Sequence, residues 1–362
     1  MKGPIRKVLV APLDWGLGHA TRCIPIIHEL QREKLEVLIA SSGDALTLLK
    51  EEFPQLTFFE LPSYRATYSL RLPLMVKVFF QLPKFLRVIS KEHEELERIV
   101  HEREIDLVIS DNRFGCWTSL VPSIFVTHQI NIQMPFALKW MQGFVNYYNH
   151  RQIRKFNQCW VPDFPENRLT LKLTEPGKLP LKFIGMLSRF KKTEAIDSFE
   201  YDYLALVSGP EPQRTFFEQK VKLIFSELNG RKILIRGLPG TDKEIVKLNK
   251  WDEAKHLSAE KLQLIIEKSA LVICRSGYST VMDLAALGKK ALFIPTPCQT
   301  EQEYLSQQLM KKEIAYSVSQ NSFSKNDVET AKGYTGFSEP YSLNLLESEI
   351  NSLVRKQLSI KE

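Results

Sequence analysis

The chain contains 362 residues, of which 44% are hydrophobic and 25% are charged. This composition is typical of globular domains and excludes a disordered chain, a collagen-like fibre and a polytopic membrane protein. Lysine and arginine outnumber aspartate and glutamate by 49 to 42, and a net charge of +7 favours a nucleic acid, an anionic membrane or a phosphate-bearing substrate as partner. Five scattered cysteines argue against a disulfide framework and against a zinc site. With no apolar run long enough to span a membrane and no signal peptide before the first strand, we expect a cytoplasmic protein.

Short apolar runs alternate with helical segments through both halves of the chain. We expect strands at 6–12, 35–40, 56–61, 105–110 and 123–127, and again at 203–208, 231–236, 270–274 and 291–295. Strands separated by helices indicate βαβ units and parallel sheets. We therefore predict an α/β protein with two Rossmann-like domains, 1–186 and 187–340, followed by a C-terminal helix at 341–362. A ligand would bind outside the carboxyl ends of the strands, in a cleft between the two sheets.

The first expected strand leads into a glycine-containing loop that ends in a histidine. Gly16 and Gly18 allow positive φ and a close approach of the backbone to a ligand. The helix that follows directs its first amides at whatever binds there. His19 lies where strand meets helix, and the ordinary pKa of histidine suits a general base at neutral pH. A histidine that only caps or packs against the helix remains the alternative.

Two loops of the second half have the residue types that bind phosphate. Ser208 and Gly209 follow an expected strand, although on these residues alone a simple turn built from glycine and two prolines is the favoured interpretation. The more informative stretch runs from Val272 to Tyr304, where Arg275, Ser276 and Gly277 lead into a helix.

That helix opens with Ser279 and Thr280, whose amides and hydroxyls form a cradle for an anion. Asp283, one turn further on, can accept both hydroxyls of a ribose. The later loop ending at residues 300–303 offers groups suited to sugar hydroxyls. The pattern predicts a nucleotide or sugar-phosphate site.

The run from Cys274 to Tyr304 closely resembles the donor-binding signature of family 28 glycosyltransferases. The loop at 16–19 is similar to the first glycine-rich loop of that family, and Thr127–Asn131 to the segment that closes its N-terminal domain. The resemblance implies the GT-B fold, in which a C-terminal domain binds a UDP-sugar and an N-terminal domain binds the acceptor.

Several site residues follow from the resemblance alone. Asp283 takes the position of the ribose-binding acid, and Gln302 and Glu303 take the positions of two glutamines that contact the donor sugar. Because Glu303 departs from that pattern, the donor sugar stays open between a hexose and an N-acetylhexosamine. The residues expected to bind the donor are Ser208, Gly209, Leu257 (against the base), Arg275, Ser276, Gly277, Ser279, Thr280, Asp283, Gln302 and Glu303.

The resemblance also implies the reaction. An acceptor hydroxyl attacks the anomeric carbon of the UDP-sugar with inversion, His19 removes the proton, and the helix near Ser276 together with Arg275 stabilises the departing diphosphate. The chain contains no Asp-x-Asp motif, which fits transfer without a metal or other cofactor, the UDP-sugar being a co-substrate.

The acceptor is not identified by the sequence. Asp111, Asn112 and His128 follow strands and are candidates for its polar contacts, although a structural network at the strand ends is an equal alternative. Residues 64–91 carry six basic residues and no acid, so they fit either a peripheral contact with the inner face of the membrane or an amphipathic helix that covers the sheet. We expect a lipid-linked or anionic acceptor of the cell envelope and no nucleic-acid partner.

Two other functions remain open at this point. One is a non-hydrolysing sugar-nucleotide 2-epimerase, which shares this architecture. The other is a UDP-sugar-binding subunit that needs a partner for activity.

Overall fold

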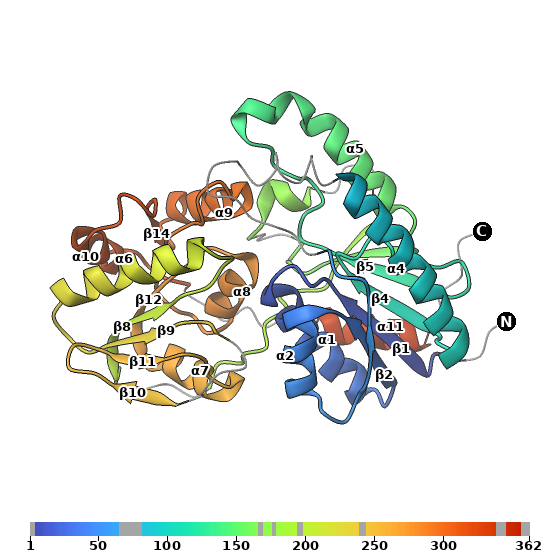
Figure 1. The fold of residues 1–362 in the computed structure, drawn as a ribbon, viewed down its shortest axis with the longest axis horizontal. Coiled ribbons are helices and arrows are strands. Elements are labelled where there is room, and N and C mark those ends of the chain that lie inside the picture. Colours follow the sequence, from blue (N-terminus) through green and yellow to red (C-terminus); the bar gives the residue numbers. More distant parts are fainter. Residues whose placement is uncertain are drawn as a thin grey trace. The chain divides into compact units, whose positions relative to one another are not determined.

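The computed structural model describes residues 4–64, 82–165, 169–175, 179–193, 198–238, 244–337 and 345–355. These residues form two compact units (Figure 1). The N-terminal unit contains the described residues up to Leu187 together with the helix near the C-terminus, and the C-terminal unit contains those of Ser188–Ser342. Among the described helices, none has both the length and the apolar character needed to cross a membrane.

The N-terminal unit is built on a parallel sheet in the order β3-β2-β1-β4-β5-β6-β7. Its strands are β1 (Lys7–Pro12), β2 (Glu36–Ser41), β3 (Thr57–Glu60), β4 (Leu107–Asp111), β5 (Ser123–Val126), β6 (Gln158–Val161) and β7 (Leu181–Phe183). Its helices are α1 (Leu17–Arg32), α2 (Gly43–Glu52), α4 (Leu82–Arg103), α5 (Gln142–Ile153) and α11 (Leu345–Arg355), with 3-10 turns η1 (Phe136–Met141) and η2 (Leu171–Thr174).

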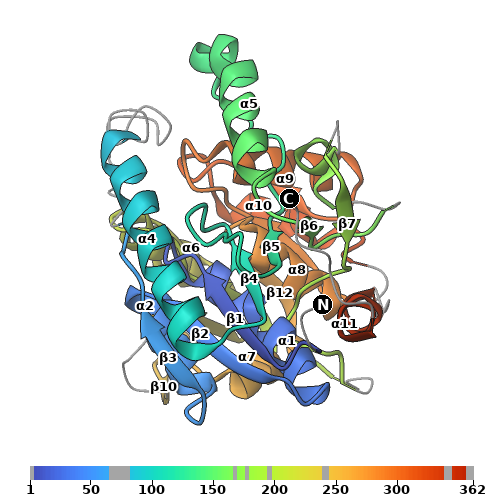
Figure 2. The same ribbon diagram turned by 90° about the vertical axis from the view of Figure 1, so that its right-hand side faces the viewer.

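Alternating side chains of the central strand β1 enter two separate cores. Val8 and Val10 pack with α1, α2 and α11 on one face, whereas Leu9 and Ala11 pack with α4 on the other. This follows from the period of two in a strand, and burial on both faces explains why β1 is continuously apolar. Ile350 of α11 is fully buried in the first of these cores, so the C-terminal helix completes the N-terminal unit (Figure 2).

The C-terminal unit is built on a second sheet, in the order β10-β11-β9-β8-β12-β13-β14, parallel except for β10. Its strands are β8 (Tyr201–Leu206), β9 (Lys232–Ile235), β10 (Ile245–Lys247), β11 (Asp252–Ala254), β12 (Ser269–Cys274), β13 (Ala291–Phe293) and β14 (Tyr316–Ser317). Its helices are α6 (Gln213–Glu227), α7 (Ala259–Glu267), α8 (Tyr278–Ala286), α9 (Thr300–Lys311) and α10 (Lys325–Lys332). Phe217 and Phe225 of α6 and Val328 of α10 cover one face of this sheet.

The predicted architecture of two parallel α/β sheets is confirmed, and the nine expected strands are present. Five strands, β6, β7, β10, β11 and β14, were not expected. They contain two to four residues and lie toward the sheet edges, where few apolar side chains are needed. Of the segment 64–91 that we considered for membrane contact, residues 65–81 lie outside the described residues. The remainder opens α4, whose Phe85 packs inward on Leu13 and Tyr64.

Candidate functional site

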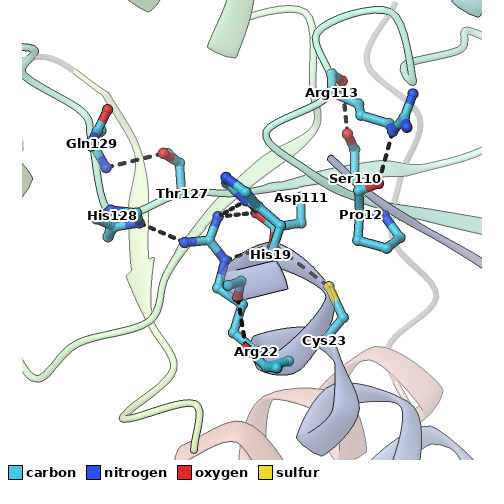
Figure 3. A network of polar contacts seen from close by, with 12 residues as sticks. Pro12, His19, Arg22, Cys23, Ser110, Asp111, Arg113, Thr127, His128 and Gln129 are labelled. Carbon is cyan, nitrogen blue, oxygen red and sulfur yellow. Dashed lines mark hydrogen bonds and ion pairs between the residues drawn. The ribbon is translucent and has the colours of Figure 1, made fainter. Parts of the chain in front are cut away.

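The first candidate site lies at the carboxyl edge of the N-terminal sheet. Parallel pairing places Asp111, the last residue of β4, beside Pro12 at the end of β1 and Val126 at the end of β5. The first two turns of α1 supply His19 and Arg22, and His128 follows β5. The structure therefore brings together His19, Asp111 and His128, which the sequence analysis selected separately (Figure 3).

Arg22 is the centre of this cluster, and its side chain is 2% exposed. Its Nε donates to Asp111 Oδ2 at 2.6 Å, and its Nη2 donates to the other oxygen of the same carboxylate. Nη1 contacts His128 Nδ1 at 2.6 Å, and Nη2 contacts His19 Nδ1 at 2.7 Å (Figure 3). One guanidinium thus contacts a carboxylate and two imidazoles at the same time.

The electrostatics of the cluster follow from its burial. Burial alone would raise the pKa of Asp111, but Arg22 and His19 outweigh it and hold that pKa well below its usual range. For His19, burial and then Arg22 lower the pKa, and Asp111 opposes them only in part. Asp111 is therefore ionised and His19 neutral at neutral pH.

A neutral His19 has two tautomers with different uses. Its Nδ1 lies 2.7 Å from Arg22 Nη2 and 3.3 Å from Asp111 Oδ1. Arginine can only donate, so Nδ1 accepts a hydrogen bond from Arg22 only when Nδ1 carries no proton. The ring proton of His19 is then on Nε2. A proton on Nδ1 is instead donated to Asp111, which leaves the lone pair of Nε2 available as a base. The side chain of His19 is 17% exposed, the largest exposure in the cluster.

The glycine loop in front of α1 has the geometry that the sequence predicts. Gly16 is the N-cap of α1 with φ of 90°, and a Cβ at this position would meet nothing within 4 Å. The loop is therefore open on this side, and the first turn of α1 contains no acidic residue to offset the helix dipole. Gly18 lies in that same turn. Asn112 has φ of 55° and directs its backbone N–H to Val126 O, so it shapes the end of β4.

Arg22 is a functional candidate that the sequence analysis missed, and Arg113 has a structural role. Arg22 lies three residues after His19, the spacing that puts two side chains on one helix face, and this signal would have found it. Arg113 is fully buried and donates to Glu92, Ser42 Oγ and the Pro12 carbonyl. Arg113 therefore belongs to a structural network at the strand ends.

The second candidate site lies at the carboxyl ends of β12 and β13 in the C-terminal unit. Ser276 Oγ donates to the Gln302 carbonyl at 2.8 Å. The side-chain oxygen of Gln302 accepts from the Thr296 N–H at 2.8 Å, and a Cβ at Gly277 would lie 4.0 Å from its Nε2. Residues 26 positions apart in the chain are thus neighbours here, and Ser276 itself is fully buried.

The start of α8 and Asp283 define the rest of this surface. Gly277 is the N-cap of α8 without a side-chain cap, and Ser279 and Thr280 lie half-buried in the first turn. Asp283 Oδ1 accepts from Ser188 Oγ at 2.7 Å. Burial raises the pKa of Asp283 to about 6, against the opposing effects of Arg189 and Ser188. Ser188 was not selected from the sequence, because nothing local indicates its partner 95 residues away.

Arg275 differs from its predicted role. Its guanidinium is 1% exposed and donates to the carbonyls of Ile294, Pro295 and Gln213 and to the side chain of Gln320. It also lies 4.3 Å from the ring centroid of Phe217. These donors are directed into the unit, so Arg275 holds loops together, a role that the sequence analysis did not predict.

The remaining candidates for donor binding differ in how close they lie to the second site and in how exposed they are. Gly209 has φ of 112°, and a Cβ there would lie 3.7 Å from Thr296 Oγ1, so the Ser208–Gly209 loop is beside the second site. Leu257 is 2% exposed, which leaves its backbone rather than its side chain to contact a base. Glu303 accepts the Cys298 N–H at 3.1 Å within the first turn of α9, a local reason for an acid at this position. No group of three or more metal-ligating side chains occurs in the described part of the chain.

Comparison with known proteins bears on the second site and on the fold. Residues 244–337 match the glycosyltransferase family 28 C-terminal domain, and this range includes Ser276, Asp283 and Gln302. The spinosyn rhamnosyltransferase SpnG is similar in structure, with 15% identity and a TM-score of 0.62 over 97% of this chain and 96% of that one. MurG of Acinetobacter baumannii is 13% identical with a TM-score of 0.59, covering 98% and 100% of the two chains. SnogD of Streptomyces nogalater is 14% identical with a TM-score of 0.59, covering 97% and 100%. No curated protein matches the chain in sequence.

The fold shared along nearly the whole chain is that of the two-domain GT-B glycosyltransferases. Within that class, residues 244–337 match the C-terminal domain of glycosyltransferase family 28. The resemblance seen in the sequence is thereby confirmed.

Proposed function

We propose that the protein transfers a hexose or an N-acetylhexosamine from a UDP-sugar to a lipid-linked or otherwise anionic acceptor, with inversion. The observation that carries the proposal is the second site: the family 28 match falls on the residues that α8 and α9 bring together, namely Gly277, Asp283 and Gln302. The SpnG structures with thymidine diphosphate and with spinosyn aglycone support a nucleotide-sugar donor and a separate acceptor for this fold.

His19 is the proposed general base. The acceptor hydroxyl attacks the anomeric carbon, the bond from that carbon to the UDP oxygen breaks, and His19 Nε2 takes the hydroxyl proton. This requires the tautomer in which Nδ1–H donates to Asp111, whose ionised carboxylate then stabilises the imidazolium that forms. Arg22 keeps that carboxylate ionised and fixes it with two hydrogen bonds, and the carboxylate in turn orients His19.

The departing diphosphate takes up negative charge that the start of α8 can stabilise. The first turn of α8 contains no acid, so the dipole of the helix favours an anion there, and Ser279 and Thr280 add hydroxyl donors. Asp283, ionised above about pH 6, accepts the ribose hydroxyls. Gln302 contacts the donor sugar in this proposal. We propose that these groups act without a metal ion or another cofactor, in the cytoplasm at the inner face of the membrane.

The test is a thermal-shift panel of UDP-, TDP- and GDP-sugars, followed by measurement of UDP release and sugar transfer to extracted envelope lipids. We expect UDP-sugars to raise the Tm of the wild type and of the control Glu260→Gln, which changes an exposed residue outside the second site. The Tm of Asp283→Asn should rise much less. EDTA should leave transfer unchanged. Turnover of UDP-N-acetylglucosamine without an acceptor would instead identify an epimerase. Tight UDP binding with no transfer to lipid or water would identify a binding subunit, and a strict metal requirement would refute the proposed chemistry.

A further inference from the structure

The segment formed by η1 and α5 presents aromatic side chains to solvent. Phe136 is 94% exposed, Trp140 81%, Phe144 69% and Tyr147 62%. Their spacing of four, four and three residues places them along one side of a helical segment, which we call the aromatic stripe. Large apolar side chains gathered on an exposed surface mark an interaction site more often than scattered ones do. In both views the segment extends beyond the strands of the N-terminal sheet (Figures 1 and 2).

The opposite side of the same segment is held to the protein by amides. Asn149 Nδ2 donates to the carbonyls of Gln129 and Ile130 at 3.0 and 2.9 Å, and Asn149 itself is 4% exposed. Asn146 Oδ1 accepts the Ile132 N–H at 2.8 Å. A helix of a globular protein ordinarily buries its apolar side and exposes its polar side. In α5 two of the three buried residues, Asn149 and Gln152, are polar and one, Ile153, is apolar, so the packing itself leaves the aromatic stripe at the surface.

Basic side chains continue the stripe. Arg151 and Arg154 are exposed on the same side, four and seven residues after Tyr147, and Lys139 is exposed beside Trp140. Along a helix, four residues correspond to about 6 Å, so the arginines lie just behind the aromatic tip. Residues 112–162 contain five lysines and arginines and no aspartate or glutamate. Arg113 is buried and paired with Glu92, and the other four basic residues have no acid within the segment to neutralise them.

We propose that the aromatic stripe docks on an anionic lipid bilayer, with Phe136, Trp140 and Phe144 inserted at the headgroup level and Arg151 and Arg154 against the lipid phosphates. Aromatic rings favour the membrane interface, and basic residues near them are attracted to anionic headgroups. A second copy of the chain fits less well, because a symmetric contact would bring the basic side chains of both copies together without an acid to pair them. The surface lies outside the segment 64–91, and the proposal does not depend on which sugar or acceptor the protein uses.

The experiment is flotation of the full-length protein with vesicles of phosphatidylcholine alone or containing one-third phosphatidylglycerol. We expect binding to the anionic vesicles, and at least about tenfold weaker binding for F136S/W140S/F144S, which removes three inserted rings. For R151Q/R154Q we expect a loss of about thirtyfold on anionic vesicles, since each basic residue contributes about fivefold, and little change on neutral ones. The matched control is L223S/V246S/L264S, which changes three exposed apolar residues of the C-terminal unit and should bind as the wild type does.

Several results would overturn this proposal. If the wild type does not float with anionic vesicles, the stripe does not dock on a membrane. The same conclusion follows if the serine triple variant floats as well as the wild type does. A wild type that is dimeric by light scattering and becomes monomeric in F136S/W140S/F144S assigns the stripe to a second copy. Binding of an oligonucleotide that R151Q/R154Q abolishes, without vesicle binding, assigns the basic residues to a nucleic acid. Thermal unfolding of each variant confirms that it is folded, and vesicle binding without sugar transfer would refute the proposed function alone.

Discussion

Asp111→Asn tests the central feature of the N-terminal site, the pairing of one buried carboxylate with Arg22 and His19. The substitution removes the negative charge and leaves Arg22, 2% exposed, without its ionic partner. Breaking a buried ion pair from one side costs about 3–5 kcal/mol, because the remaining charge stays buried. For a unit of this size, that corresponds to a fall in Tm of about 6–20 °C. The exposed residue Asp44 in the first turn of α2 supplies the control, Asp44→Asn, which should unfold as the wild type does.

The same change should affect catalysis in a recognisable way. Without Asp111, the His19 imidazolium loses its partner and the productive tautomer loses its acceptor, so turnover should fall by about 10⁴-fold, close to the effect of His19→Ala. Donor affinity should change little, because the donor candidates lie in the C-terminal unit. Asp111 also raises the pKa of His19, so the acid limb of the residual activity should move to lower pH. UDP release measured over a range of donor concentrations and pH values separates these effects.

The pairing itself is tested by the double variant R22Q/D111N. Removing both charges leaves no isolated charge buried, so the double variant should lose less stability than the two single losses added, by about 2 kcal/mol. Thermal and urea unfolding of the four proteins measure this coupling. Strictly additive losses, or normal turnover in Asp111→Asn, would refute the reasoning that Arg22 and Asp111 act as one unit behind His19.

Two further predictions concern the C-terminal unit. Affinity for a UDP-sugar, whose diphosphate diester does not titrate in this range, should weaken as the pH falls from neutral through about 6, because Asp283 then becomes protonated and no longer accepts both ribose hydroxyls as an anion. Asp283→Asn should abolish this dependence in calorimetry, and an unchanged pH profile would remove Asp283 from the ribose site. Arg275→Met should lower the free energy of unfolding by about 2–4 kcal/mol, because buried carbonyls lose their donors. UDP affinity measured below the new Tm should stay the same, whereas weaker affinity with unchanged stability would restore Arg275 to the diphosphate site.

The sequence was sufficient for the parts of the fold that depend on burial. Strands such as β1 and β12 are buried on both faces and read as continuous apolar runs, and the helices between them imply parallel order. The strands β10 and β11 were not foreseeable in this way. They carry acidic and basic side chains at a sheet edge, and their pairing depends on the neighbouring strand rather than on their own composition.

Site residues that lie close together in the sequence could be predicted. Contacts between residues far apart in the sequence could not. Gly277 and Asp283 lie on one helix start, so spacing alone placed them together. Arg275 is adjacent in sequence to this group but points into the unit, because Phe217 and three carbonyls form a pocket for its guanidinium. Asp111 meets Arg22 across 89 residues, and only the parallel pairing of β1 with β4 shows that they are neighbours.

The net charge of +7 divides between regions that bind in different ways. The family 28 match at 244–337 contains 12 basic and 11 acidic residues, so the donor diphosphate of the proposed function would be held by helix dipoles and hydroxyls rather than by a surplus of cations. The acid-free segment 112–162 carries five basic residues, of which Arg113 is paired with Glu92 and the other four have no acid within the segment. Basic side chains that have no acidic neighbour attract a large anionic partner over about a Debye length. A single diphosphate can be bound without such long-range attraction. The surplus therefore lies in the N-terminal half, in residues 64–91 and beside the aromatic stripe, and the proposed recognition of a nucleotide does not depend on it.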